Sequence, residues 1–66
     1  MSIKALRANV NLSQEQVAEY LGISRESYRN KENGKRKFTF EEGHKLSDLF
    51  NVSLDMIYQA TMVAAA

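Results

Sequence analysis

Apolar residues recur along the chain at intervals of three and four positions, in short groups separated by polar residues. The recurring sets are Ile3, Leu6 and Val10; Val17, Ala18 and Leu21; Phe40, Leu46, Leu49 and Phe50; and Leu54 and Ile57, with Tyr58 as a further candidate. This spacing places each set on one face of an α-helix, so that the sets face a common core. No alternating run of β-branched residues spans even five positions, and the pattern therefore predicts an all-α protein.

Five positions carry the signals of a helix N-terminus. The expected N-cap residues are Ser2, Ser13, Ser24, Thr39 and Ser53. Gln16 follows Ser13 and Glu42 follows Thr39 by three positions, which predicts a capping box at each of these two starts. Five starts in a chain of this length predict five helices of about two to three turns each.

Residues that tolerate a left-handed backbone stand where these helices must end. They are Asn11, Gly22, Gly34 and Asn51. Because Ser24 caps the next helix so soon after Gly22, three or four residues connect two short helices, which must cross steeply. Ala18 is the small residue on the inner face that lets them approach. This is a helix-turn-helix arrangement.

The composition indicates one small globular domain. Sixty-six residues without cysteine provide neither a disulfide framework nor a cysteine-rich zinc site. Such a small core supplies only a few kcal/mol, so that local signals, dimerisation or binding must add stability. No apolar run approaches the roughly 20 residues of a membrane span, and no signal peptide is evident. We therefore expect a cytoplasmic protein without membrane contact.

The net charge of +1 conceals an asymmetry. The segment 24–37 has six basic and two acidic residues, a net charge of +4, whereas the rest of the chain has three basic and six acidic residues, a net charge of −3. A charged run is usually only a solvated face, but one concentrated basic segment on an otherwise acidic body favours a polyanionic partner.

Several motifs together resemble the phage-repressor/Cro family of helix-turn-helix proteins, the Xre-like group. They are "LSQEQVAEYLGIS", then Tyr28, then "ENGKRK" and "LFNVSLDMI". The resemblance covers roughly residues 3–58 and implies a five-helix bundle of the lambda-repressor-like type. Residues 1–58 would form the DNA-binding domain. The tail, residues 59–66, would extend the last helix, contact a second subunit or be disordered.

The resemblance implies that the helix at about residues 25–33 enters the major groove of double-stranded DNA. With Tyr28 facing the core, the open side of this helix carries the expected base readers Arg25, Glu26, Arg29 and Asn30. Arginine can fork onto guanine, asparagine can pair with adenine, and glutamate can accept from cytosine. The expected phosphate-binding residues are Gln14, Ser24, Ser27, Asn33, Lys35, Arg36 and Lys37.

Two positions carry structural expectations from the same resemblance. Arg7 and Glu32 match a family pair that forms a salt bridge between the first helix and the end of the third. Lys31 stands where the family usually has an apolar core residue, so we expect a looser end of that helix. The lone histidine, His44, is expected at the surface.

These observations predict a bacterial or phage transcription regulator, a repressor, in the cytoplasm or nucleoid. It would bind a palindromic operator as a homodimer, since one helix reads too few base pairs to find a site in a genome. The expected dimer interface is Leu54, Tyr58, Met62 and Val63. No cofactor, metal or small-molecule substrate is expected. One histidine and no cysteine give no catalytic set, so the chain is not expected to be an enzyme.

Two alternatives remain at this point. The same fold occurs in antitoxins, for which a protein such as a toxin is the main partner, and an antirepressor is a comparable partner. The fold also occurs as a protein-interaction module without specific DNA. The basic segment argues against a purely protein-binding role.

Overall fold

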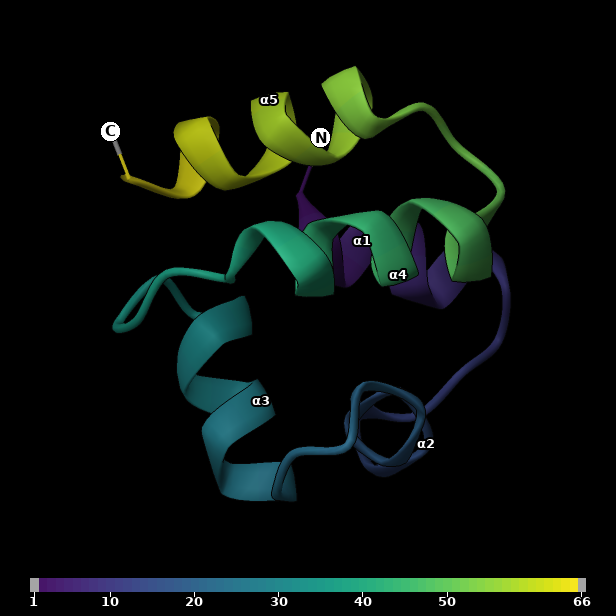
Figure 1. The fold of residues 1–66 in the computed structure, drawn as a ribbon, viewed down its shortest axis with the longest axis vertical. Helices are drawn as coiled ribbons and strands as arrows, with labels where there is room; N and C mark the ends of the chain where they lie inside the picture. Colours follow the sequence, from purple (N-terminus) through teal and green to yellow (C-terminus); the bar gives the residue numbers. More distant parts are fainter. Residues whose placement is uncertain (1, 66) are drawn as a thin grey trace.

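The computed structural model describes residues 2–65, with the side chains of residues 2–61, and this part of the chain forms five helices and no strand (Figure 1). The helices are α1 (Ile3–Asn9), α2 (Gln14–Leu21), α3 (Arg25–Glu32), α4 (Phe40–Phe50) and α5 (Leu54–Ala65). The predicted all-α bundle is confirmed. Helix α5 continues into the 59–66 tail as far as Ala65.

Two groups of helices make up the molecule. Helices α1 and α5 pack on α4, while α2 and α3 pack on each other at the end of the molecule away from α5 (Figure 1). The helix-turn-helix pair is therefore one face of the protein, and α5 lies on the opposite side. The molecule measures 24 × 24 × 20 Å along its principal axes.

Every predicted N-cap is present. Ser2, Ser13, Ser24, Thr39 and Ser53 each accept a hydrogen bond from the backbone N–H three residues later, at 3.0–3.1 Å. Ser13 with Gln16 and Thr39 with Glu42 form complete capping boxes. These bonds satisfy backbone donors that a helix N-terminus otherwise leaves without partners.

The first four helices also end in the same way. Asn11, Gly22, Gly34 and Asn51 all adopt a left-handed backbone, with φ between 56° and 84°. After α3, for example, the Gly34 N–H donates to the Lys31 carbonyl at 3.2 Å and the Lys35 N–H to the Asn30 carbonyl at 2.9 Å. This pair of bonds is a Schellman motif, and equivalent pairs follow α1, α2 and α4. Backbone geometry thus fixes the direction of each following loop.

The core contains most of the predicted apolar positions. Its buried members are Ile3, Leu6, Val17, Ala18, Leu21, Tyr28, Leu46, Phe50, Ile57 and Ala60. Tyr28 is fully buried and is the point at which α3 contacts this core. Val10 and Leu49 are partly buried against the same cluster.

Two aromatic residues do not follow the predicted stripes. Phe40 is 76% exposed and Tyr58 is 61% exposed. Phe40 lies six residues before Leu46, which places it about 120° around α4 from the buried stripe. Its ring instead meets the exposed His44 edge-on, with ring centroids 4.6 Å apart. On α5 the inner stripe is Ile57 and Ala60, so the neighbouring Tyr58 faces outward.

Gly43 sits inside α4 in a helical conformation, and a methyl group fits there. A Cβ atom would lie 3.8 Å from Leu54 Cδ1 and 4.0 Å from Ile57 Cγ2, which are ordinary contacts. We expect Gly43→Ala to raise the free energy of unfolding by about 0.5–1 kcal/mol, because alanine restricts the unfolded chain and packs against α5. Denaturant titration measures the change.

Gly22→Ala is the matched control for this substitution. Gly22 has φ of 76°, where a Cβ atom is strained, although nothing lies within 4 Å of it. This variant should lose roughly 1–2 kcal/mol. If Gly43→Ala destabilises the protein instead, α4 and α5 pack more closely than the contact distances given above indicate, and the prediction is wrong.

Candidate nucleic-acid interface

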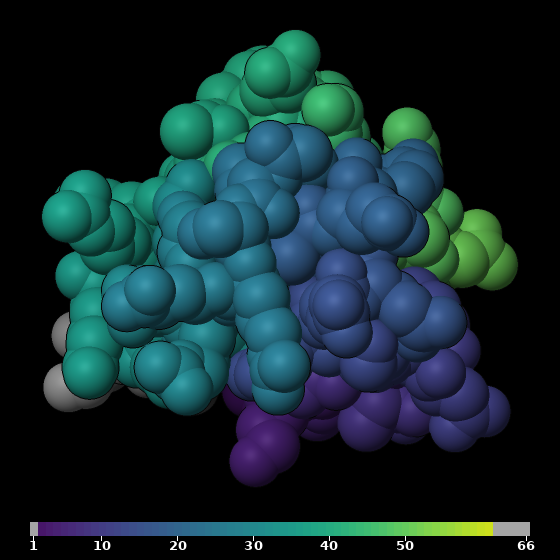
Figure 2. Space-filling view, turned by 90° about the horizontal axis from the view of Figure 1, so that it is seen from below, coloured from purple at the N-terminus to yellow at the C-terminus, as the bar shows by residue number. Residues whose placement is uncertain are grey.

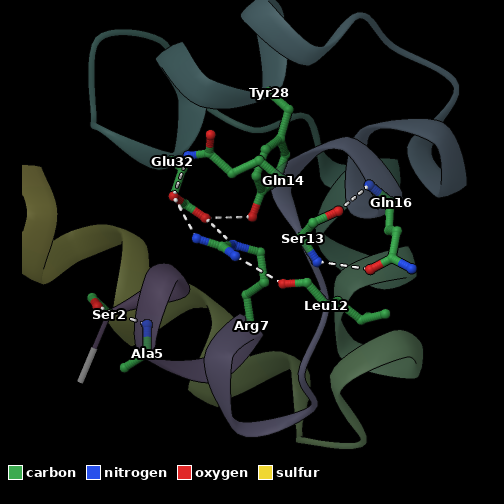
Figure 3. Close-up of polar contacts among 9 residues, drawn as sticks. All are labelled: Ser2, Ala5, Arg7, Leu12, Ser13, Gln14, Gln16, Tyr28 and Glu32. Carbon is green, nitrogen blue, oxygen red and sulfur yellow. Dashed lines mark hydrogen bonds and ion pairs between the residues drawn. The ribbon is translucent and has the colours of Figure 1, made fainter.

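A buried carboxylate, that of Glu32, joins three helices behind the helix-turn-helix face (Figure 3). Arg7 Nε donates to Glu32 Oε2 at 2.8 Å, and Arg7 Nη2 donates to Oε1 at 3.4 Å. Gln14 Nε2 donates to Oε1 at 2.8 Å, and the Tyr28 hydroxyl donates to Oε2 at 2.7 Å. The ion pair expected between Arg7 and Glu32 is thus part of a larger network.

The Arg7 guanidinium extends this network to the backbone. Its Nη1 donates to the Leu12 carbonyl at 2.8 Å, in the loop between α1 and α2 (Figure 3). Arg7 therefore fixes the loop that leads into α2, while Glu32 fixes the last turn of α3. The angle between the two helices is held by charge-assisted hydrogen bonds as well as by apolar packing.

The network shifts the ionisation of its members. Burial alone would raise the pKa of the Glu32 carboxyl, but the hydrogen bonds from Arg7, Gln14 and Tyr28 outweigh burial and lower that pKa below its ordinary value. Burial, together with the bond to Glu32, raises the pKa of the Tyr28 hydroxyl well above its usual range. Glu32 is therefore ionised and Tyr28 neutral at pH 7.

A second buried ion pair joins α3 to α4. Lys31 Nζ donates to both carboxylate oxygens of Glu42, at 2.7 and 2.8 Å, and the two side chains are only 12% and 10% exposed. Burial works against ionisation of Glu42, but the bonds from Lys31 and from the Thr39 N–H lower its pKa. The expectation of a loose end of the third helix is wrong, because Lys31 holds that end to the start of α4.

The outward face of α3 carries the predicted base readers. Arg25, Glu26 and Arg29 are exposed, and Asn30 is half-buried at the edge of the loop that follows. Figure 2 views the molecule from this side, where α2 and α3 lie together and the 33–39 loop borders α3. The structure thus brings the four side chains to one surface of a single helix.

The predicted phosphate-binding residues border the same surface but differ in how they are engaged. Lys35, Arg36 and Lys37 are exposed on the loop between α3 and α4, next to Asn33 at the end of α3. Ser24 Oγ accepts the Ser27 N–H, so the expected N-cap role is present. Gln14 begins α2, and one of its two amide hydrogens is directed to Glu32.

A comparison with known families gives a match over most of the chain. A family model described as "Helix-turn-helix" matches residues 3–57. The chain belongs to this Xre-like, phage-repressor/Cro-like helix-turn-helix family. Family members are DNA-binding regulators, and the match covers α1 to α4 and the start of α5. Comparisons with curated proteins and with solved structures give no significant match.

Within this helix-turn-helix protein, sequence reasoning missed the Lys31–Glu42 pair and two of the donors to Glu32. The two partners of the first pair are 11 positions apart across a loop, and no periodicity links them. Glu42 carries one signal in the sequence, its predicted place at the third helical position of a capping box, but that role gives its second carboxylate oxygen no partner.

Among the described residues, no helix has the length and apolar character to cross a membrane, and no acidic, histidine or cysteine cluster is arranged to hold a metal.

The Glu32 network predicts a specific acid sensitivity. Because the pKa of Glu32 is lower in the folded than in the unfolded protein, its contribution to stability is complete above about pH 4.5 and is lost as the pH falls through the lowered value. Glu32→Gln keeps the shape of the side chain but leaves Arg7, only 14% exposed, without its counter-charge. We expect Glu32→Gln to lower the free energy of unfolding by about 3–5 kcal/mol at pH 7. Below pH 4.5 the free energy of unfolding should fall less steeply with pH than in the wild type.

Glu19→Gln is the control, because Glu19 is an exposed carboxylate on α2. It should change stability by less than about 0.5 kcal/mol and keep the full acid dependence of the wild type. Denaturant titration between pH 2 and pH 7 measures both variants. An unchanged pH profile in Glu32→Gln would contradict the role given to this carboxylate.

Proposed function

We propose that the protein is a sequence-specific transcription regulator, a repressor, that binds a palindromic operator as a homodimer. The observation that supports this most directly is the row of exposed Arg25, Glu26 and Arg29 on α3, beside Asn30. These residues belong to a segment of net charge +4 on a small, otherwise acidic protein. A helix of this shape and charge suits the major groove.

Each base-reading side chain has a matching base edge. Arg25, in the first turn of α3, would fork onto the O6 and N7 acceptors of a guanine. Glu26 would accept from the N4 amino group of a cytosine, and Asn30 would pair with the N6 and N7 atoms of an adenine. Arg29 lies one turn beyond Arg25 and would contact a base or the adjacent phosphate.

The neighbouring positions would fix the register on the backbone. These phosphate contacts are proposed for Gln14, Ser24, Ser27, Asn33, Lys35 and Lys37, and the sequence predicts the same role for Arg36, for which the structure suggests a different contact that is argued in the next subsection. Gln14 retains a second amide hydrogen after bonding to Glu32, and it stands at the N-terminus of α2, where backbone N–H groups attract anions. Its bond to Glu32 would hold the amide in the orientation that a phosphate requires.

Dimerisation is proposed through α5 and the surface beside it. Tyr58 is exposed on α5 and Leu54 is half-buried, whereas the Met62 and Val63 side chains lie outside the described residues. A hollow of about 810 Å³ adjoins them, with apolar walls that include Phe38, Phe40 and Ile57. Exposed apolar surface of this kind is typical of an interaction site.

The dimensions are compatible with two adjacent subunits on DNA. Successive major grooves on one side of the duplex are about 34 Å apart, and the long axes of the protein measure 24 Å. Two copies that meet along the side of the molecule where the apolar hollow runs from α5 to the 34–40 segment would stand next to one another and place one α3 in each groove. Occupation of an operator by both copies would exclude other proteins from the same base pairs, which accounts for repression.

Arg25→Ala tests base recognition. We expect it to weaken binding to the preferred duplex by about 1–3 kcal/mol and to relax the choice at one base pair. Lys35→Ala should weaken all duplexes alike and reduce the salt slope of binding by about one unit. Titration of both variants against preferred and random duplexes separates the two roles. Equal losses for Arg25→Ala on both DNAs would remove Arg25 from the base readers.

Tyr58→Glu tests the dimer. Because Tyr58 is exposed, the substitution leaves the core intact but places a charge in the proposed interface. Sedimentation should show a wild-type dimer that becomes monomeric in Tyr58→Glu. Tyr20→Glu, which alters an exposed tyrosine on α2, should leave the dimer unchanged. A wild-type protein that stays monomeric at high concentration, both free and on DNA, would contradict the proposal.

A further inference from the structure

A polar hollow of about 350 Å³ lies between α3 and the loop that follows it. Its walls are formed by Ser24, Glu26, Ser27, Asn30, Lys31 and Arg36. Two of the proposed base readers, Glu26 and Asn30, thus share a concave surface with Arg36. The sequence predicts only a phosphate contact for this loop residue.

Existing hydrogen bonds reduce the groups that this hollow offers to a ligand. Lys31 Nζ is engaged by both oxygens of Glu42. Ser24 Oγ accepts the Ser27 N–H. The strongest remaining acceptor is the exposed carboxylate of Glu26, and the remaining cation is the exposed guanidinium of Arg36.

The backbone holds Arg36 at this place. The Asn30 carbonyl accepts the Lys35 N–H at 2.9 Å and the Arg36 N–H at 3.3 Å, so the loop folds back onto the last turn of α3. At the other end of the loop, the Lys31–Glu42 pair fastens the start of α4 to α3, and Thr39 caps α4. Arg36 is therefore carried on a segment anchored at both ends, which limits the entropy lost when its side chain binds.

We infer that Glu26 and Arg36 together read one G·C base pair, Glu26 contacting the cytosine and Arg36 the guanine. This inference rests on the proposed function, in which α3 lies in the major groove. There a G·C pair presents a donor, the cytosine N4 amino group, next to two acceptors, the guanine O6 and N7 atoms. A carboxylate and a guanidinium on one hollow match that pattern. In an A·T pair the donor, the adenine N6 amino group, lies between the two acceptors, adenine N7 and thymine O4, so the fork of the guanidinium has no adjacent pair of acceptors.

The distinction between a base contact and a phosphate contact is chemical. A phosphate stands at every position of the duplex, so a phosphate contact carries no sequence information, whereas a contact with guanine O6 and N7 is made only at a G·C pair. Arg36→Ala therefore removes discrimination at one base pair if Arg36 reads a guanine, and weakens all duplexes alike if it contacts a phosphate.

The experiment uses a duplex that the wild-type protein selects from a random pool, together with the set of duplexes that differ from it at one base pair per half-site. Arg36→Ala should lose discrimination at one G·C pair, and its affinity should fall at least about 10-fold more for the selected duplex than for a scrambled duplex. Glu26→Gln should lose discrimination at the same pair.

Lys37→Ala is the control, since it alters an exposed cation on the same loop and should weaken all duplexes alike. Full discrimination in Arg36→Ala, or losses at different base pairs in Arg36→Ala and Glu26→Gln, would overturn the joint reading while leaving the proposed function standing. A wild-type protein that selects no sequence from the pool would overturn both.

Discussion

The arrangement of the candidate DNA-binding face depends on the hydrogen bonds that the Glu32 carboxylate accepts. This carboxylate accepts hydrogen bonds from Arg7 on α1, Gln14 on α2 and Tyr28 on α3, and so connects the three N-terminal helices at one point. A buried charge of this kind adds little net stability compared with apolar packing, but the loss of one partner is costly. Its consequence is geometric, because the crossing of α2 and α3 is fixed while the outer face of α3 stays open.

A 66-residue chain without disulfides needs such fixed points, since its core is small. Helix ends supply many of them. Five capped N-termini and four Schellman motifs determine where each helix begins and ends. The Lys31–Glu42 pair then joins α3 to α4 across the loop of residues 33–39. In this way the polar contacts restrict the loop geometry, while the apolar residues form the buried core.

The elements of the fold were predictable because their signals are local. A serine or threonine cap, a glutamine or glutamate three residues later and a left-handed asparagine each act within about one turn of chain. The Lys31–Glu42 pair was not predictable, since it joins residues on different helices and replaces an apolar contact that the family pattern favours. The exposure of Phe40 does not follow from the apolar pattern, because this residue stands about 120° around α4 from the buried stripe although it is close to that stripe in sequence. Of the candidate interface, the exposed positions on α3 followed from the burial of Tyr28, whereas the hollow shared by Glu26 and Arg36 depends on how the loop folds back.

The account proposed above is that a rigidly held helix presents its polar face to the major groove, and that a second copy makes the same contacts in the next groove. Methylation interference on a duplex selected by the protein tests this account most directly, because guanine N7 lies in the major groove and adenine N3 in the minor groove. The account predicts that N7 methylation blocks binding in two clusters about one helical turn apart, and that N3 methylation within those clusters has no effect. Interference from N3 positions alone, or from a single N7 cluster, would contradict it.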